Sequence, residues 1–391
     1  MKTITLDRVN RLVLWKQYLT DESRTKDIVQ IVQNIGGLHA TSATTPYLSL
    51  FARIRDFNKD NLDEALYVKK DLGKIRCMRK TLHILAKEWI PVAYAATKGI
   101  VEKSSKKHME FRGVSSKQYE EISKSILDIL TNNKMTASEL KKQLNTPLPV
   151  STILYYMCDQ GLLIRDKPKK GWKDKIHTYS AFQVYFPSLE LSKLGEQEAI
   201  AQLVQTYMKS FGPVTEKDIV WWTGLGKTQI RRILEEFQEQ LIPIKISELE
   251  GDFTILGTDE WLLEHNQIIQ EKIVNFLPIL DPYLMGYKER ERYLRTEHYI
   301  YVFDRSGNAT STIIYDGQVI GIWDFTEEPE PLVKLFLFEE VENKALKEIY
   351  SKARKIGQFI ANRQVQIKEC DSMVPLTERT AGGMMSPLKF C

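Results

Sequence analysis

Hydrophobic positions along the first third of the chain recur every three or four residues, the spacing of helices that bury one face. A charged stretch, Lys74–Leu85, interrupts this pattern and mixes polar and apolar residues in the manner of a strand. Around it, we expect helices over Leu6–Leu19, Thr25–Ile35, Tyr47–Ala52, Asn61–Lys70 and Glu88–Gly99.

The middle of the chain repeats one arrangement, three helices followed by a hairpin, which is typical of a winged helix. The first copy includes Thr136 and Glu139, placed to form a capping box at the start of its second helix. A weaker copy follows it along the chain. The predicted helices are Gln118–Leu130, 136–144, Pro149–Gln160, Glu196–Ser210, Glu216–Trp222 and Lys227–Phe237. The predicted strands are Leu162–Arg165, Ile176–Val184, Ile242–Ile246 and Asp252–Leu256.

After Gln267 short apolar runs dominate, and Asp316-Gly317 has the composition of a tight hairpin turn. A long amphipathic helix is expected over Val341–Arg363. The pattern predicts a small β-barrel or curled sheet closed by that helix. Its strands are expected at Ile273–Leu277, Tyr299–Val302, Ser311–Tyr315, Val319–Asp324 and Leu332–Phe338.

Together these elements predict an α+β protein in which tandem winged-helix motifs precede a small C-terminal β-barrel. We expect an N-terminal helical or winged-helix module at residues 1–114 that carries the candidate active site. A second winged helix would occupy 115–190 and a third 191–268, with the barrel at 269–365. Residues 366–391 show no periodicity and are expected to form a tail.

Composition narrows the functional classes. The chain has 391 residues, ample for several cores, and its four cysteines are far apart and unpatterned. Neither a zinc site nor a disulfide framework is indicated, and we expect no metal or cofactor. No apolar run approaches the ~20 residues of a membrane span. Because no secretory signal is recognisable either, we expect a cytoplasmic protein in a reducing compartment.

The net charge of +4 conceals an asymmetry between the two halves of the chain. Residues 1–190 hold 32 Lys or Arg against 20 Asp or Glu, whereas residues 191–391 hold 23 against 31. A basic half presents positive charge to an acidic partner, most simply a phosphate backbone. The alternative is a solvated surface without a partner.

The most basic segment is the expected hairpin tip Arg165–Lys175, which holds six Lys or Arg around Trp172. Cations with an aromatic ring among them suit contact with a nucleic-acid backbone together with base stacking. We therefore expect Lys169, Lys170, Trp172 and Lys173 to bind DNA. A mobile, solvated hairpin is the alternative.

The segment Asn34–Arg53 is unusual for a region between two buried helices. It contains paired glycines, His39 and a run of short hydroxyl side chains. Such residues suit a concave wall that faces a ligand. An ordinary helix–loop–helix corner, in which Ser and Thr cap the next helix, explains the same residues.

Four separate motifs stand in an order and spacing that resemble one known family. They are Gly37–Leu50, Arg79–Leu85, Leu277–Arg290 and Asp316–Trp323. Together they resemble the winged-helix DNA-binding proteins of the AlkZ/YcaQ-like DNA glycosylase superfamily over about residues 5–365. The resemblance implies a C-shaped arrangement of three winged-helix motifs and a β-barrel around a DNA-sized channel. It also implies a bacterial, nucleoid-associated DNA repair protein that excises alkylated bases and unhooks interstrand crosslinks.

One departure from the family pattern falls at the site that matters most. Characterised branches carry Gln-x-Gln or Gln-x-Asp where this chain has His39-Ala40-Thr41. We expect a neutral His39 to accept a proton from the attacking water, with Thr41 orienting that water. Activity would then decline as the pH falls through the ordinary imidazole pKa of ~6.5. The alternative is a non-catalytic relative, a damage sensor or transcriptional regulator, in which His39 is a hydrogen-bonded loop residue.

Further DNA contacts are expected from two places. Arg76 and Arg79 would bind phosphates near the lesion, or instead form an ion pair with the motif around Asp281. Tyr287, Lys288 and Arg290 would contact DNA, or instead form a solvated strand edge. The expected partner is damaged double-stranded DNA, with no membrane. Because no free apolar stripe is present, we expect a monomer.

Overall fold

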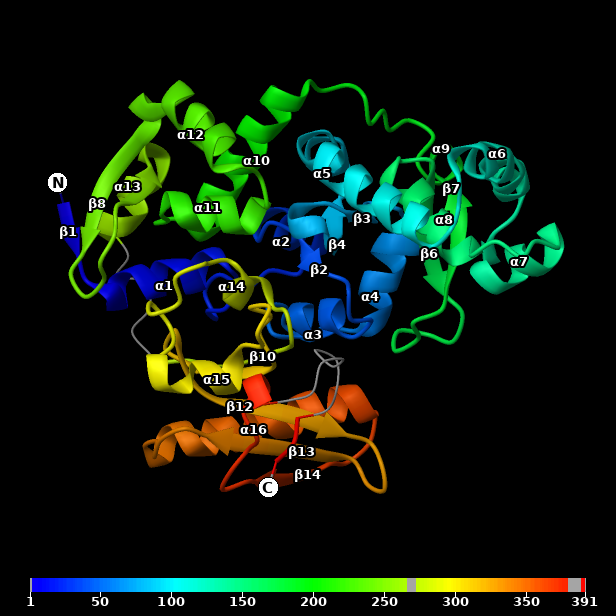
Figure 1. Ribbon diagram of the computed structural model, residues 1–391. Coiled ribbons are helices and arrows are strands. Elements are labelled where there is room, and N and C mark those ends of the chain that lie inside the picture. Colours follow the sequence, from blue (N-terminus) through cyan, green and yellow to red (C-terminus); the bar gives the residue numbers. More distant parts are fainter. Residues whose placement is uncertain (1, 266–271, 379–387, 391) are drawn as a thin grey trace.

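Helices and four small sheets build an α+β protein (Figure 1). The computed structural model describes residues 2–265, 272–378 and 388–390. In Figure 1 two groups of helices lie on opposite sides of the N-terminal elements, and the C-terminal sheet lies below them. No helix in these ranges is long and apolar enough to cross a membrane.

The N-terminal elements begin where the hydrophobic spacing predicts helices. Thr5 caps α1 by accepting a hydrogen bond from the Arg8 backbone N–H, and Asp27 caps α2 in the same way. Gly37 then turns the chain at φ +95°, where a Cβ would come within 2.5 Å of Leu85. The elements are α1 (Leu6–Lys16), α2 (Ile28–Asn34), β2 (Leu38–His39), α3 (Thr45–Phe51) and α4 (Lys59–Asp63).

The charged stretch expected as one strand is instead a hairpin. β3 (Leu72–Arg76) and β4 (Leu82–Ala86) pair antiparallel across a short turn in which Arg79 has φ +53°. The following helix, α5 (Ile90–Phe111), continues past Gly99. It does so because Gly99 is exposed while apolar residues continue the buried face on both sides of it. The predicted end at glycine was therefore wrong.

The second group of helices follows the predicted three-helix and hairpin order. Thr136 and Glu139 form the expected capping box at the start of α7. Apolar residues from the three helices close a separate core around Ile153. The elements are α6 (Ser116–Asn132), β5 (Met135–Thr136), α7 (Ala137–Leu144), α8 (Val150–Asp159), β6 (Leu163–Pro168) and β7 (His177–Ala181), with sheet order β5-β7-β6.

A third group repeats this order and adds a strand from the beginning of the chain. β1 (Lys2–Ile4) pairs parallel with β8 (Leu241–Ile246), so the N-terminal residues of the chain join the sheet of this third group. Local periodicity does not show such a pairing. The other elements are α9 (Phe182–Tyr185), α10 (Glu196–Phe211), α11 (Glu216–Thr223), α12 (Lys227–Glu236), β8 (Leu241–Ile246), β9 (Phe253–Leu256) and α13 (Gly257–His265). The predicted boundary at 268 lies outside the described residues.

The C-terminal region is a five-stranded sheet with α16 packed on it (Figure 1). Its order is β10-β11-β12-β13-β14, so among the described strands the hydrogen bonds do not close a barrel. Asp316 and Gly317 form the expected tight turn, both with positive φ. The elements are β10 (Val274–Leu277), α14 (Pro282–Met285), α15 (Tyr299–Val302), β11 (Thr312–Tyr315), β12 (Gln318–Thr326), β13 (Leu332–Leu337), α16 (Asn343–Ala361) and β14 (Gln366–Glu369).

Two expectations for this region were wrong. Tyr299–Val302 is the short helix α15, because a four-residue apolar run satisfies helix and strand periods equally well. The expected tail begins with β14, which pairs parallel with β13 and extends the sheet.

A buried ion pair joins the N-terminal helices to the C-terminal region. Arg53, just past the end of α3, binds Asp281 at the start of α14 through two hydrogen bonds of 2.7 and 2.8 Å. Both side chains are fully buried. Ser49 donates a third hydrogen bond to the same carboxylate at 2.8 Å, and the Tyr283 backbone N–H donates a fourth at 3.0 Å.

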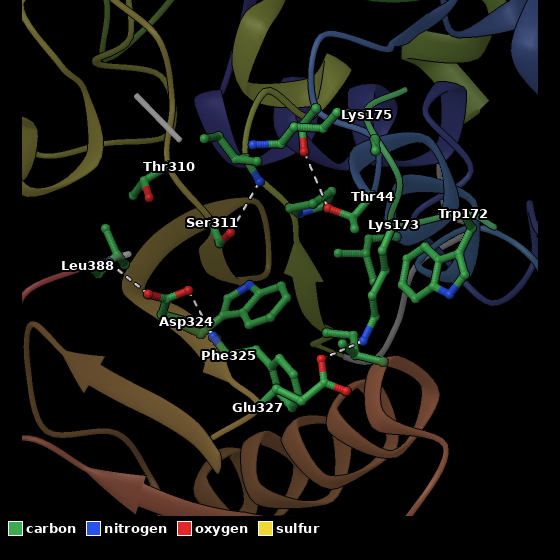
Figure 2. A pocket seen from close by; sticks show the side chains of 17 residues that line it. Thr44, Trp172, Lys173, Lys175, Thr310, Ser311, Asp324, Phe325, Glu327 and Leu388 are labelled. Atoms are coloured by element: carbon green, nitrogen blue, oxygen red, sulfur yellow. Dashed lines mark hydrogen bonds and ion pairs between the residues drawn. The ribbon is translucent and has the colours of Figure 1, made fainter. Parts of the chain in front are cut away.

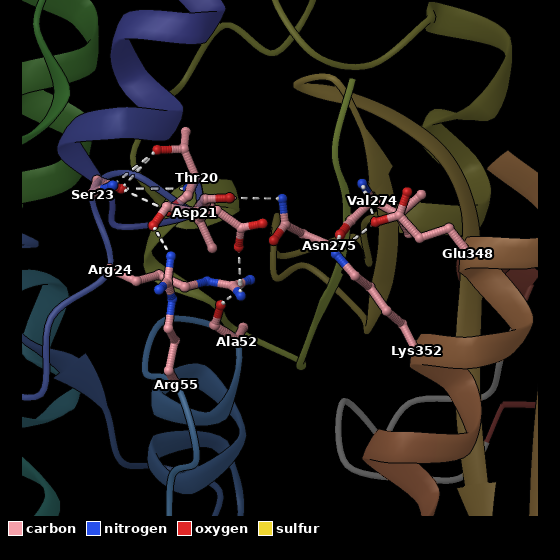
Figure 3. A network of polar contacts seen from close by, with 11 residues as sticks. Thr20, Asp21, Ser23, Arg24, Ala52, Arg55, Val274, Asn275, Glu348 and Lys352 are labelled. Atoms are coloured by element: carbon pink, nitrogen blue, oxygen red, sulfur yellow. Dashed lines mark hydrogen bonds and ion pairs between the residues drawn. The ribbon is translucent and has the colours of Figure 1, made fainter. Parts of the chain in front are cut away.

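A second set of polar contacts supports the same junction (Figure 3). Asn275 on β10 donates a hydrogen bond to the Leu19 carbonyl at 3.2 Å. Arg24 binds the Asp21 carboxylate at 2.9 Å and donates to the Ala52 carbonyl at 3.3 Å. Arg55 donates to the Asp21 carbonyl at 2.7 Å. The loop after α1 is thereby tied to both α3 and the C-terminal sheet.

We predict that Asp281→Asn destabilises the protein by about 3–5 kcal/mol, because it leaves the Arg53 charge buried without its partner. Urea unfolding followed by circular dichroism measures this change. Asp7→Asn is the matched control, since it removes the exposed partner of Arg11 and should cost less than about 1 kcal/mol. Equal losses in the two variants would contradict the structural role of the buried pair.

Candidate active site

Two histidines face each other at the centre of the N-terminal region. β2 pairs antiparallel with β4, and the register sets His39 directly opposite His83. Their ring centroids are 4.4 Å apart, and the side chains are 6% and 5% exposed. His83 Nδ1 lies 3.1 Å from the Thr81 carbonyl oxygen, whereas His39 Nδ1 is buried without a hydrogen-bond partner. His39 therefore has a buried ring nitrogen, Nδ1, that forms no hydrogen bond with the described residues.

Burial keeps both imidazoles neutral. It lowers the pKa of His39 well below 6.5, and the neighbouring His83 and Arg79 lower that pKa further. Burial also lowers the pKa of His83 to about 4, although its hydrogen bond to Thr81 acts in the opposite direction. Neither ring titrates near its ordinary value, so the expected loss of activity through ~6.5 does not fit this environment.

Thr41 follows His39 by two residues along the chain. His39 is buried, but Thr41 is exposed and the chain between them has left the strand. Ser42 Oγ and Thr44 Oγ1 are 3.3 Å apart, and Thr45 donates a hydrogen bond to the Ile279 carbonyl at 3.0 Å. The loop is thus fixed to the C-terminal region.

Arg79 and Arg290 lie against one tryptophan. The Arg79 guanidinium is 3.8 Å from the centroid of Trp221 on α11, and that of Arg290 is 5.3 Å from the same centroid. Gly224 allows this approach, because a Cβ there would lie 3.0 Å from the Arg79 Cα. Burial and the Arg290 charge lower the pKa of Arg79 to about 10, so it remains cationic at neutral pH.

The charge of this pair is not balanced by an ion pair in the described residues. Arg290 donates to the Gly307 carbonyl at 2.9 Å and to the Tyr299 hydroxyl, both uncharged acceptors. Arg79 Nη1 is buried without a hydrogen-bond partner. Arg290 is itself only 5% exposed, which assigns its side chain mainly to the core rather than to a solvated edge. Arg290 Nε is likewise buried without a hydrogen-bond partner, so each guanidinium keeps one unused donor.

Arg76 has a structural partner. It forms an ion pair with the Asp159 carboxylate of α8, and its guanidinium lies 4.2 Å from the Tyr155 ring centroid. The alternative pairing of Arg76 with the motif around Asp281 is wrong, because Arg53 takes that carboxylate. In this arrangement the Arg76 side chain ties the β3–β4 hairpin to the second group of helices.

The motif around Tyr287 lies mostly in the core, which does not fit the expected DNA contact. Tyr287 is fully buried, and its hydroxyl donates a hydrogen bond to the Phe211 carbonyl at 2.7 Å. Arg292 covers the Tyr287 ring at 3.8 Å. Lys288 is exposed and is fixed only by its backbone N–H, which donates to Asp218 at 2.8 Å. Of the three expected residues, Lys288 is the one that faces solvent.

The basic β6–β7 loop is folded onto the rest of the protein. Lys173 forms an ion pair of 2.8 Å with Glu327, and Lys169 pairs with Glu139. The Trp172 ring lies 5.2 Å from Tyr47 and 5.9 Å from Phe359, measured between centroids. Lys170 is fixed through its backbone N–H, which donates to Asp174 at 2.9 Å.

These contacts tie the β6–β7 loop to aromatic and basic side chains elsewhere in the protein. Trp172 packs on protein rings instead of standing free for base stacking. The Lys59 ammonium lies 4.7 Å from the Trp172 ring centroid and 4.6 Å from that of Phe359. The loop therefore bridges the second group of helices, α4 and α16.

A cavity of about 360 Å³ lies where three parts of the chain meet (Figure 2). The β2–α3 loop, the β6–β7 loop and the C-terminal sheet form its walls. Figure 2 shows Asp324 and Ser311 across the cavity from Trp172 and Lys173. The lining residues are Ser42, Ala43, Thr44, Leu48, Trp172, Lys173, Lys175, Pro278, Ile279, Thr310, Ser311, Trp323, Asp324, Phe325, Glu327, Ile360 and Leu388.

Sequence reasoning named the hydroxyl-rich loop and Trp172 but missed the opposite wall. Trp323 and Asp324 end the predicted strand Val319–Asp324 and Phe325 follows it, and only their placement beside the loop makes them a site. Trp221 was missed as well, because an aromatic residue on a short helix has the appearance of core. For the opposite wall, the signal available in the sequence was a carboxylate, Asp324, between two aromatic residues, Trp323 and Phe325. Among the described residues no group of His, Cys, Asp or Glu is arranged to hold a metal ion.

The order of the helix groups and small sheets is that of an AlkZ-like fold. The chain belongs to the DNA glycosylase AlkZ-like family, whose model matches residues 32–359. The structure is similar to Streptomyces sahachiroi DNA glycosylase AlkZ, at 18% sequence identity and a TM-score of 0.75. That match covers 94% of this chain and 100% of the other, and it shows a shared fold. The chain matches none of the curated protein sequences.

We predict that acid destabilises the protein through the buried histidines. The folded-state pKa of His83, about 4, lies below its ordinary 6.5, so the unfolded chain binds more protons between these values. The free energy of unfolding should therefore fall as the pH drops through this window. His83→Gln should flatten that pH dependence by up to about one proton.

Urea unfolding at a series of pH values measures this slope. The matched control is His108→Gln, which replaces an exposed histidine on α5 and should leave the slope as it is in the wild type. An unchanged slope in His83→Gln would show that the buried ring does not resist protonation.

Proposed function

We propose that this protein is a monofunctional DNA glycosylase that releases alkylated purine bases from double-stranded DNA. The single observation that carries this proposal is the family match, which spans both candidate catalytic positions, His39 and Thr41. The shared fold over nearly the whole chain supports it, because it includes the C-terminal region that forms one wall of the cavity.

The proposed substrates are purines alkylated at N7, including crosslinked ones. Such a base is cationic, so its glycosidic bond is already weakened, and the base departs with the bonding electrons while the sugar takes on oxocarbenium character. The protein must then place a water beneath C1′. We propose that neutral His39 holds this water through hydrogen bonding and that the Thr41 hydroxyl orients it. A lowered pKa makes His39 a weak base, but it keeps the imidazole neutral over a wide pH range.

We propose that the two groups of helices with hairpins are winged-helix modules, as their element order supports. Together with the N-terminal elements and the C-terminal sheet they would form a C-shaped particle around DNA. The basic charge of residues 1–190 supports that placement. We further propose that the protein acts as a monomer in the cytoplasm, associated with the nucleoid.

Contacts to the DNA backbone would come from Arg and Lys side chains whose N–H groups can donate hydrogen bonds to phosphates. Arg79 is the foremost of these, because one of its buried donors lacks a partner beside the Arg290 charge. Lys288 and Lys170 present further cations. Lys169 and Lys173 would exchange their carboxylate partners for phosphates, and Trp172 would have to leave Tyr47 before it stacks on a base.

A second candidate function is supported by the burial of His39. If the imidazole stays enclosed against His83, the protein would bind damaged DNA without cleaving it, as a sensor or a regulator. Exposed Thr41 alone offers a hydroxyl, which is a poor proton acceptor. The two functions differ in one measurable event, the release of a base.

We predict that the wild-type protein releases 7-methylguanine from methylated duplex DNA and leaves an abasic site without cutting the strand. His39→Ala should lower the single-turnover rate by ~10²–10⁴-fold at unchanged DNA affinity. Thr41→Ala should cost less. Because the pKa of His39 is well below 6.5, the wild-type rate should stay level as the pH falls through that value.

Chromatography of released bases and binding to a labelled duplex separate catalysis from affinity. Binding without base release, unaffected by His39→Ala, would establish the non-catalytic alternative. Replacing both positions with glutamine, His39→Gln with Thr41→Gln, restores the family pattern. Activity gained only in that double variant would show a glycosylase scaffold in which His39 is not the catalytic group.

We predict that DNA affinity falls steeply with salt, as counterion release requires. Arg79→Ala should flatten the log–log slope by about 0.9, and replacing Lys169, Lys170 and Lys173 together by Ala should flatten it by up to about 0.9 per contact. Lys347→Ala, an exposed charge on α16, is the control that should leave the slope unchanged. If Lys347→Ala alone alters the slope, the DNA binds the C-terminal region instead.

A further inference from the structure

The turn between β3 and β4 has an unusual backbone. Arg79 and Lys80, its two central residues, adopt φ +53° and +59°. The Thr81 backbone N–H closes the turn by donating to the Met78 carbonyl at 3.1 Å. Hairpin turns with positive φ at both central positions ordinarily contain Asn and Gly there. Long side chains cost free energy in this conformation, which therefore persists only where neighbouring groups hold it.

Arg76 holds this turn from the side of the second group of helices. Its Nε and Nη2 donate hydrogen bonds to the Lys80 carbonyl oxygen at 3.0 and 2.9 Å. Its Nη1 forms the ion pair with Asp159 on α8, and the Tyr155 ring centroid lies 4.2 Å from the guanidinium. The side chain is 6% exposed. Because each of its three nitrogens already has a partner, Arg76 is poorly placed to bind a phosphate itself.

Arg79 faces the third group of helices instead. Its guanidinium lies 3.8 Å from the Trp221 ring centroid on α11. Gly224 at the end of α11 allows the turn to come this close, because a Cβ there would lie 3.0 Å from both N and Cα of Arg79. The side chain is half-buried, and its Nη1 has no hydrogen-bond partner among the described residues. The two arginines of the hairpin therefore differ: the protein occupies Arg76 fully and leaves Arg79 without an ionic partner.

We infer that Arg76 is the positioning residue for the DNA phosphate contact of Arg79, an inference that rests on the proposed DNA binding. Arg76 acts through the Lys80 carbonyl, which it fixes in the left-handed turn. Without these two hydrogen bonds the turn would relax towards negative φ and carry Arg79 away from Trp221. A guanidinium held in one place presents its planar set of N–H groups to a phosphate with less loss of freedom than a mobile one.

Lysine at position 76 separates this positioning role from the charge of the residue. Arg76→Lys keeps a positive charge beside Asp159. A single ammonium group cannot pair with that carboxylate and also donate two hydrogen bonds to the Lys80 carbonyl, and it lacks the planar face that lies over Tyr155. The variant should therefore lose the phosphate contact of Arg79 although no charge has been removed.

The salt dependence of duplex binding, followed by fluorescence anisotropy with the full chain, tests the inference without any catalytic step. Arg76→Lys should flatten the log–log slope by about 0.9, as Arg79→Ala does. The double variant should have the slope of Arg79→Ala alone, because both changes remove the same contact.

Arg292→Lys is the matched control. Its buried guanidinium likewise donates two hydrogen bonds to one carbonyl, that of Pro213, and covers a tyrosine ring, that of Tyr287. The same chemical change is thus made outside the β3–β4 turn. Arg292→Lys should keep the wild-type slope, and urea unfolding of both variants compares their losses of stability.

The outcomes that overturn the inference are distinct. A wild-type slope in Arg76→Lys, while Arg79→Ala flattens it, would show that Arg76 does not position Arg79. A double variant with a flatter slope than Arg79→Ala would show that Arg76 serves a contact of its own. Equal flattening in Arg292→Lys would assign the effect to lost stability. Base release is measured in parallel: the expected slopes without release would refute the proposed glycosylase function alone.

Discussion

The ion pair between Arg53 and Asp281 is the constraint on which the rest of the structure depends. Two fully buried charges are costly to desolvate, and here every oxygen of the carboxylate receives a hydrogen bond. Because Arg53 follows α3 and Asp281 begins α14, the pair fixes the hydroxyl-rich loop against the C-terminal sheet. Two of the three cavity walls come from these regions, so the ion pair holds those two walls together.

The ionisable side chains of the candidate site differ in their charge states. The imidazoles of His39 and His83 are enclosed and neutral, while Arg79 keeps its charge beside Trp221. A DNA strand would therefore meet a cationic side chain beside an enclosed, uncharged pair of histidines.

Local patterns along the sequence determined much of this architecture. The helical periods, the Thr136 capping box and the Asp316-Gly317 turn are all confirmed, because each depends on near neighbours. Contacts between distant residues were beyond such reasoning: β1 pairs with β8, and Arg53 binds a carboxylate 228 positions away. The site was predicted in part for the same reason. His39 and the loop stood out by composition, but their enclosure by His83 and the wall at Asp324 arise only from folding.

Release of a base tests the central claim most directly. Duplex DNA that contains 7-methylguanine is incubated with the wild-type protein and with His39→Ala under single-turnover conditions, and the released bases are separated by chromatography. The account predicts release by the wild type and a rate lower by ~10²–10⁴-fold in His39→Ala. DNA binding without base release by either protein would contradict it.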